Sequence, residues 1–217
     1  MDMDVDNASN TTAFPNSVDD LVSEVTTGLN NIYEAYSPLR EDLDLPATFH
    51  KAFQQSSIQT VYQVFEAVGN KIKEPNVTEG LSTATQLLKE SSQKTEILGD
   101  ILKKVASPSD VSAKDRYIDA VRQLGPGNTV EALMLRIMGN ARGLAADNAI
   151  ARELLHNLQE AIKELEAMEP SIPENETGNF FSHHGSGNQF NNTGLGKQFN
   201  NTGEGRQYQA DVMNFKD

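Results

Sequence analysis

Apolar residues over most of the chain recur every three or four positions, the spacing that places them on one face of an α-helix. No stretch before the last quarter alternates apolar and polar residues as a half-buried strand does. The pattern therefore predicts an all-α helical bundle of four to six helices over residues 14–169. The six apolar faces are Val18, Leu21, Val25, Leu29, Ile32 and Tyr36; Phe49, Phe53, Val61, Phe65, Val68 and Ile72; Leu81, Leu87, Leu88, Ile97, Leu98, Ile101, Leu102 and Val105; Tyr117, Ile118, Val121 and Leu124; Val130, Leu133, Met134, Ile137, Met138, Ala141 and Leu144; and Leu154, Leu155, Leu158, Ile162 and Leu165.

Capping residues, prolines and glycines indicate where these helices begin and end. The polar stretch 54–60 can bend or break the second helix, and Asp147 or Asn148 divides the fifth from the sixth. The expected starts are Ser17, Leu45-Pro46, Asn76 with Glu79 and Asn128 with Glu131, and the expected stops are Ser37-Pro38, Ser107-Pro108 and Gly125-Pro126-Gly127.

From Gly178 onward the pattern becomes a nine-residue repeat. Four units align, GNFFSHHGS, GNQFNNTGL, GKQFNNTGE and GRQYQADVM, and Asn214-Phe215 begins a truncated fifth. The first position is always glycine and the fourth is always aromatic. Glycine, asparagine and threonine are poor helix formers. One aromatic ring in nine residues buries too little surface to order the segment by itself.

Stacking of many copies supplies the hydrogen bonds and the buried surface that a single copy lacks. In-register copies of Gln-Phe-Asn-Asn-Thr pair every backbone amide with the chains above and below, and their amide side chains and rings form ladders. Glycines supply the turns. We therefore predict a disordered, amyloid-competent β-repeat tail over residues 178–217. Its expected motif residues are Gly187, Gln189, Phe190, Asn191, Asn192, Gly194, Gly196, Gln198, Phe199, Asn200, Asn201, Gly203, Gly205, Gln207, Tyr208 and Phe215.

Two other interpretations fit parts of the repeat. Calcium-binding β-rolls also repeat every nine residues, but they place Asp in the turn, where this chain has Gly, Asn, Lys, Arg and Leu. A flexible Gly/Asn-rich tail is the simpler alternative. Such tails seldom keep aromatic residues and glutamines in register, so stacking is the favoured interpretation.

Charge and composition narrow the class of protein. The net charge is −13, and residues 178–217 hold three basic and three acidic side chains, so the whole charge lies in residues 1–177. An acidic chain is a poor binder of nucleic acid. The absence of cysteine excludes disulfides. With no long apolar run and no signal peptide, we expect a cytoplasmic protein with a flexible acidic leader over residues 1–13.

Candidate chemistry in the body is weak, and we expect no enzyme, cofactor or metal site. His50 and His156 lie far apart among ordinary helical neighbours. Gly125-Pro126-Gly127 lacks the spacing and lysine of a phosphate-binding loop. The acidic residues Glu41, Asp42 and Asp44 lack the glycine and final glutamate of an EF-hand.

Two further groups have a structural and a functional interpretation. Met134 and Met138 can form an adaptable partner groove, but a stripe of the core is favoured. Glu160, Glu164 and Glu166 with Lys163 fit a solvated helix face better than a pair of catalytic carboxylates, so neither group indicates catalysis. Because none of these groups in the body indicates a functional site, the tail is the candidate functional site.

The tail sequence GSGNQFNNTGLGKQFNNTGEGRQYQA resembles the sigma motif, a prion-forming segment found on fungal NOD-like receptors with a NACHT domain and on their partner effectors. The body resembles the SesA-type domain, an N-terminal domain of fungal NACHT and P-loop NTPases, at LNNIYEAY (29–36), LPATFHKAF (45–53) and DRYIDAVRQLGPGNTVEALM (115–134). Residues 170–177 are then a linker. No NACHT domain follows, so the chain resembles a stand-alone effector.

The resemblance implies a role in fungal programmed cell death, heterokaryon incompatibility or innate-immunity-like signalling. A NACHT receptor with a matching motif would template the tail, and the tail would self-assemble. Related effectors then act on the plasma membrane, although the acidic residues Asp19, Asp20 and Glu24 disfavour insertion of the first helix without a shape change. The alternative is a non-lytic adaptor that polymerises through its tail and recruits other proteins through the helical body.

Overall fold

The computed structural model describes residues 17–72, 81–125, 127–147, 150 and 152–173. Within these residues the chain forms seven α-helices and one 3₁₀ helix and contains no strand, which confirms the predicted helical bundle. The leader 1–13 and the tail 178–217 lie outside the described residues. The elements are α1 (Val18–Tyr36), η1 (Ser37–Leu39), α2 (Ala47–Ala52), α3 (Gln55–Ile72), α4 (Leu81–Ala106), α5 (Ala113–Leu124), α6 (Val130–Asp147) and α7 (Arg152–Glu166).

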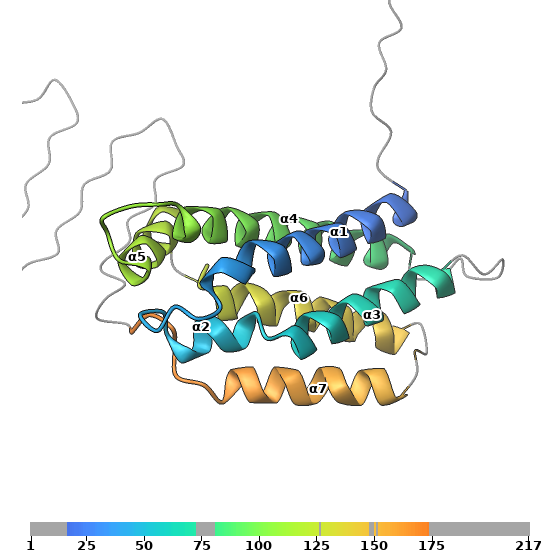
Figure 1. Cartoon of the computed structure of the whole chain (residues 1–217). Helices are drawn as coiled ribbons and strands as arrows, with labels where there is room; N and C mark the ends of the chain where they lie inside the picture. Colours follow the sequence, from blue (N-terminus) through green and yellow to red (C-terminus); the bar gives the residue numbers. More distant parts are fainter. Residues whose placement is uncertain (1–16, 73–80, 126, 148–149, 151, 174–217) are drawn as a thin grey trace, which may run out of the picture.

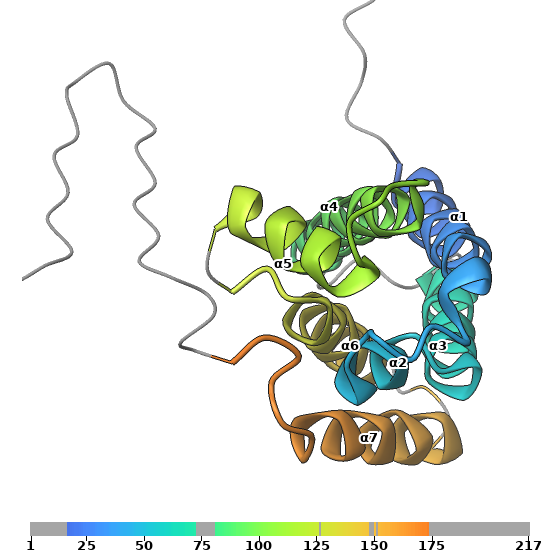
Figure 2. The same cartoon turned by 60° about the vertical axis from the view of Figure 1, so that its left-hand side comes forward.

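Four helices form the centre of the bundle. Helix α1 packs against α3 and α4, and α6 packs against the same two helices, so the four close a ring around a shared core (Figure 2). Each contributes side chains with no exposed surface, such as Leu29 on α1, Phe65 on α3, Leu98 on α4 and Leu133 on α6. Burial of one such side chain stabilises the fold by about 1.5–3 kcal/mol. The apolar faces predicted from the sequence therefore meet in one core, except that Leu124, predicted on the face of α5, is 39% exposed.

Helices α1 and α4 run in the same direction and approach closely (Figure 1). Ser92 donates a hydrogen bond to Glu24 at 3.3 Å, and Gly28, one turn further along α1, faces Thr95. A Cβ atom added at Gly28 would lie 2.4 Å from the Thr95 hydroxyl oxygen. On the other side of α1, a Cβ atom at Gly69 would lie 2.9 Å from Val22. Glycine at both positions thus allows α1 to pack tightly on α4 and α3.

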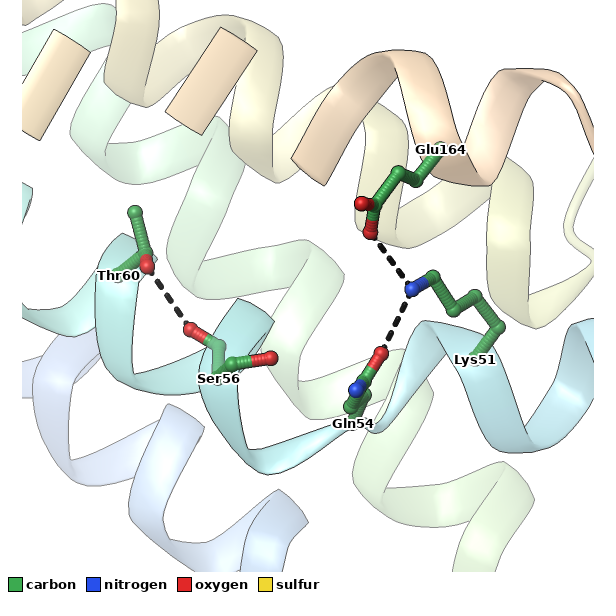
Figure 3. A network of polar contacts seen from close by, with 5 residues as sticks. All are labelled: Lys51, Gln54, Ser56, Thr60 and Glu164. Carbon is green, nitrogen blue, oxygen red and sulfur yellow. Dashed lines mark hydrogen bonds and ion pairs between the residues drawn. The ribbon is translucent and has the colours of Figure 1, made fainter. Parts of the chain in front are cut away.

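Helices α5 and α7 cover the outside of the ring. α5 packs on α4, whereas α7 packs on α6, α3 and α2 and buries Leu158, Ile162 and Leu165 (Figure 2). The Lys51 side chain of α2 donates at 2.7 Å to Gln54, which lies just before α3, and forms an ion pair at 2.7 Å with Glu164 of α7 (Figure 3). The Glu164 side chain is 60% exposed. Because exposed ion pairs contribute about 1 kcal/mol at most, the apolar side of α7 holds it in place.

The polar stretch after Phe53 divides the second predicted helix into α2 and α3. The backbone of Phe53 leaves the helical region at φ −103° and ψ 15°. The division lets Phe49 of α2, Phe53 at the C-cap of α2 and Val61 of α3 all reach the core, where each is fully buried. The sequence analysis left open whether this stretch bends or breaks the helix, and the structure shows a break.

Two of the predicted helix ends are confirmed in detail. Ser17 and Asp20 form a capping box at the start of α1, with the Asp20 amide donating to the Ser17 hydroxyl at 3.2 Å. Gly125 ends α5 with a φ of 87°, a conformation that glycine adopts without strain. The pair Asn76 and Glu79 lies outside the described residues.

The predicted capping box of Asn128 and Glu131 is wrong. The side-chain amide of Asn128 donates to the carbonyl oxygens of Leu124 and Gly125 at 2.9 and 3.2 Å, so this side chain caps the end of α5. The Thr129 hydroxyl accepts the Ala132 amide at 3.4 Å instead. Glu131 is unavailable for capping because its carboxylate binds a distant segment.

Candidate functional site

The last described residues fold back onto the bundle immediately before the tail begins. After α7 the chain makes a turn in which the Met168 amide donates to the Leu165 carbonyl at 3.2 Å. Ser171 and Ile172 are then buried, each with 3% of its surface exposed. These residues belong to the stretch that the sequence analysis treated as a linker. The root of the tail is therefore part of the packed body.

Ser171, itself buried, is held by a network of polar contacts that we call the tail anchor: Thr48, Tyr117, Glu131 and residues 169–172. The Ser171 amide donates to Glu131 Oε1 at 3.0 Å, and its hydroxyl donates to Glu131 Oε2 at 2.6 Å. The same hydroxyl lies 2.6 Å from the Tyr117 hydroxyl. Thr48 donates to the Glu169 carbonyl. Helices α2, α5 and α6 thus each contribute one side chain.

Tyr117 organises this network from the core. Its ring is fully buried, and its hydroxyl accepts the Val130 amide at 3.2 Å. Burial raises the pKa of Tyr117 well above its ordinary value, and the nearby Glu131 carboxylate raises it further. The hydrogen bonds to Ser171 and Val130 oppose this shift. The hydroxyl accordingly keeps its proton and donates it to Ser171, which in turn donates to Glu131.

An aromatic cluster lies behind the tail anchor. The Phe49 ring packs edge-on against Tyr117 at a centroid distance of 4.9 Å and against Phe53 at 5.1 Å. The Tyr36 ring lies tilted against Phe53 at a centroid distance of 5.2 Å, and the Tyr36 hydroxyl lies 2.9 Å from His50 Nδ1. The stretches 29–36, 45–53 and 115–134 singled out in the sequence therefore meet at this cluster.

His50 has a structural role in the same corner. Its Nε2 lies 2.9 Å from the Asp42 carbonyl oxygen, and its Nδ1 lies 2.9 Å from the Tyr36 hydroxyl. The tautomer with its proton on Nε2 satisfies both contacts, donating to the carbonyl and accepting from the tyrosine. Burial raises the pKa of Tyr36, and this effect outweighs the opposing charge of Arg40. His50 thus connects the turn after η1 to α1.

The remaining candidates in the body have structural positions. Met134 and Met138 are fully buried, so they form a core stripe and no groove. His156 is exposed on α7. Lys163 pairs with Glu160 at 2.7 Å on the same helix, which fits a solvated face and lowers the pKa of Glu160 through that contact. In the acidic turn, the Asp44 amide donates to Asp42 at 3.0 Å.

The described part of the body offers neither a cluster of metal ligands nor a membrane-spanning helix. Among the residues that the structure describes, no three His, Asp or Glu side chains gather where they could hold a metal ion. No helix in that part of the chain is long and apolar enough to cross a bilayer. The predicted motif residues Gly187 to Phe215 lie outside the described residues, so the structure does not place them.

Sequence reasoning missed the tail anchor. Its signal was faint: Ser171 and Ile172 stand between Pro170 and Pro173, and a single isoleucine in a polar stretch does not stand out. Glu131 gave a misleading signal because its spacing from Asn128 matched a capping box. The contacts that hold Ser171 come from residues 40 and 54 positions away, which no local pattern reveals.

Comparison with known families adds two matches. The model of the SesA domain, described as an N-terminal domain on NACHT NTPases and P-loop NTPases, matches residues 22–144. The model of the sigma domain on NACHT NTPases matches residues 178–216. No curated protein and no solved structure matches the chain. Both matched families are associated with NACHT NTPases, which supports a NACHT-associated signalling role with a NACHT receptor as the kind of partner.

Proposed function

The chain belongs to the SesA family of N-terminal domains on NACHT and P-loop NTPases, and from this we propose that it is a signalling effector switched on by amyloid templating of its tail. The trigger is a NACHT receptor, of the NOD-like class, that carries a matching segment. The output is fungal programmed cell death, in heterokaryon incompatibility or in an innate-immunity-like response.

The proposed mechanism begins with oligomerisation of the receptor, which stacks its own segments into a template. Residues 178–216 of this chain then add to the open edge of that stack through backbone hydrogen bonds. Further copies add in the same way, so the assembly grows by self-association. Each added copy brings one helical bundle with it, and the local concentration of bundles rises.

The observation that carries this proposal is the presence of a SesA domain and a sigma-type segment in one chain. The tail anchor adds support from the body. Ser171 and Ile172 are packed on the bundle, and Gly178 follows them closely in the sequence. Because the packed residues and the repeat are so close in the sequence, each tail that joins an assembly brings its helical bundle close to that assembly.

A non-lytic adaptor is the second candidate, and one observation favours it. The apolar side of α1, from Leu21 to Tyr36, is buried in the core, and its first turn carries Asp19 and Asp20. Insertion of α1 into an anionic bilayer would require it to leave the core and bring these charges to the membrane. In this version the clustered bundles recruit another protein through an outer helical face.

We further propose that the protein is not an enzyme and that it resides in the cytoplasm until activation. The buried Tyr117 and Ser171 and the half-buried Glu131 use their hydrogen bonds on one another, so within the described residues this cluster offers no free pair of nucleophile and base. An effector would move to the plasma membrane on activation, whereas an adaptor would stay in cytoplasmic assemblies.

Seeding tests the proposal and separates the two candidates. Cells that express the full chain receive preformed fibrils of residues 178–217, and their viability and the assembly of the protein are scored. In a parallel sample the full chain is seeded in the same way beside liposomes, and leakage from the liposomes is scored. Loss of viability with leakage supports the effector, and assembly without leakage supports the adaptor. The matched control replaces Phe190, Phe199 and Tyr208 by Asp. A wild-type chain that stays diffuse after seeding contradicts the proposed function.

A further inference from the structure

A groove between α1 and α3 has a lining without charged side chains. It encloses about 280 Å³ and is lined by Asn30 and Tyr33 of α1 and Gln55, Ile58, Gln59 and Tyr62 of α3. The two helices lie side by side in both views (Figures 1 and 2). The lining contains three amides and two phenol rings and no carboxylate, although the body carries the whole negative charge of the protein.

The floor of the groove is apolar and its rim is polar. Ile58 is 4% exposed, and Tyr33 and Tyr62 are half-buried beside it. Arg40 lies over the Tyr33 ring at 5.4 Å and donates to its hydroxyl at 3.1 Å, which fixes that ring. An aromatic side chain laid on this floor would contact a fixed ring and an aliphatic side chain, an arrangement that suits ring packing.

The rim offers hydrogen-bonding groups that the body does not use. Asn30, Gln55 and Gln59 are exposed, and within the described part of the chain their side-chain amides make no hydrogen bond. A primary amide has two donor hydrogens and one acceptor oxygen. Three of them around an apolar floor fit an extended segment that presents an aromatic ring between amide side chains.

We propose that this groove holds one Gln-Phe-Asn-Asn-Thr unit of the chain's own tail, Gln189–Thr193 or Gln198–Thr202, while the protein is monomeric. The unit supplies one aromatic ring and three amides, and it is uncharged like the lining. Burying an uncharged segment there costs no charge desolvation, in contrast to a basic or acidic peptide.

The tail is long enough to reach the groove. The described chain ends at Pro173, and residues 174–188 precede the first such unit. These residues span up to about 50 Å when extended, whereas α4, the longest helix at 26 residues, is about 39 Å long. The extended span exceeds the length of the longest helix, so the tail is long enough for a unit to lie on the bundle without disturbing the tail anchor.

Docking of this kind would hold back self-assembly, a consequence that rests on the proposed function. A unit on the groove has its ring and amides engaged and cannot join a stack at the same time. A receptor template, which offers a full ladder of partners, outcompetes the single groove. The groove would thus raise the threshold for spontaneous assembly and leave templated assembly intact.

The test uses the full chain in dilute monomeric form, in which the absence of native cysteine allows one spin label to be placed. Ser56→Cys puts the label beside the groove, and Gln86→Cys puts it at an exposed position on α4. We expect selective broadening of the backbone resonances of one or both units from the first label and none from the second. Equal broadening from both labels, or none from either, overturns the proposal.

Two further comparisons sharpen the test. Gln55→Ala with Gln59→Ala should weaken docking roughly fivefold, the loss expected for about 1 kcal/mol of hydrogen bonding, and reduce the broadening accordingly. Gln86→Ala with Gln93→Ala on α4 is the matched control and should change nothing. Broadening that grows with protein concentration would identify a second copy as the occupant and overturn the intramolecular form. Seeded growth is scored separately, so failure of the proposed function is recognised by itself.

Discussion

At the scale of single residues, buried polar groups explain how the end of the body is held. Tyr117 has no exposed surface, and its hydroxyl links the Val130 amide to Ser171. A buried hydroxyl with partners contributes about 1 kcal/mol, but a partner left unsatisfied costs up to about 3 kcal/mol. Ser171 has its amide and its hydroxyl on the two oxygens of Glu131, which fixes both its backbone and its side chain.

The raised pKa of Tyr117 predicts a specific dependence of stability on pH. The folded protein holds the phenol proton more tightly than the unfolded chain, so this contribution is complete below the ordinary pKa of 10.0 and is lost as pH rises above it. The free energy of unfolding should therefore fall by up to about 1.4 kcal/mol per pH unit more in the wild type than in Tyr117→Phe. Urea titrations of both proteins between pH 9 and 11 measure this difference. Parallel curves would contradict the assignment.

Gly28 provides a second prediction at this scale. Gly28→Ala should lower the free energy of unfolding by about 1–3 kcal/mol, because the new methyl group meets the Thr95 side chain and forces α1 and α4 apart. Gly99→Ala, also inside a helix, is the matched control. Nothing lies within 4 Å of a Cβ atom there, so it should be neutral or stabilise by about 0.5–1 kcal/mol. Equal effects of the two substitutions in urea denaturation would refute the close approach.

At the scale of elements, the helices and the tail differ in the source of their order. Helix α1 keeps its ends through Ser17 and the Ser37-Pro38 turn, but its place comes from burial against α3 and α4. The tail repeat has one aromatic residue per nine and gains order, as we propose, from copies of itself. The same chain thus combines an element that folds within one molecule with one that needs many.

The stacked register predicts the effect of substitutions in the tail. Replacing Phe190, Phe199 and Tyr208 by Asp should abolish seeded fibril growth, because each layer would bury a row of like charges. Gln198→Pro should act in the same direction by removing one ladder donor. Thioflavin fluorescence with preformed seeds measures fibril growth. The control is Lys197→Arg, because Lys197 is not one of the motif residues and the substitution keeps its positive charge. Normal growth of either variant would count against the register.

At the scale of the whole molecule, the described body ends later than the SesA match. The family model stops at residue 144, whereas α7 and the tail anchor continue the packed structure to Ile172. α7 covers α3 and α6, and the anchor then returns the chain to α2, α5 and α6. The junction between body and tail is consequently a folded feature of the protein.

Truncation tests this boundary. A chain ending at Pro173 should be more stable than one ending at Met168 by about 3 kcal/mol, because the shorter chain loses the burial of Ile172 and the hydrogen bonds of Ser171. Urea denaturation followed by circular dichroism measures the difference, and both chains should remain helical. Equal stability would show that residues 169–172 contribute nothing to the body.

Much of the helical architecture could be predicted from the sequence, and the errors have identifiable causes. The face from Leu21 to Tyr36 was predicted correctly, because periodicity is a local property. The role of Glu131 was predicted incorrectly, because a carboxylate in the first turn can cap its own helix or bind a distant group. The candidate motif in the tail was read from its repeat alone and stays a prediction.

The sequence by itself determined the helical class, the helix ends at Ser17 and Gly125, and the division between an acidic body and a repeat with no net charge, because side-chain spacing and capping act over a few residues. Only the tertiary structure decided that α1 lies parallel to α4, that Glu131 holds Ser171, and that the tail begins from a packed root. These features depend on contacts between residues far apart in the chain, whose free energy appears only when the core has formed.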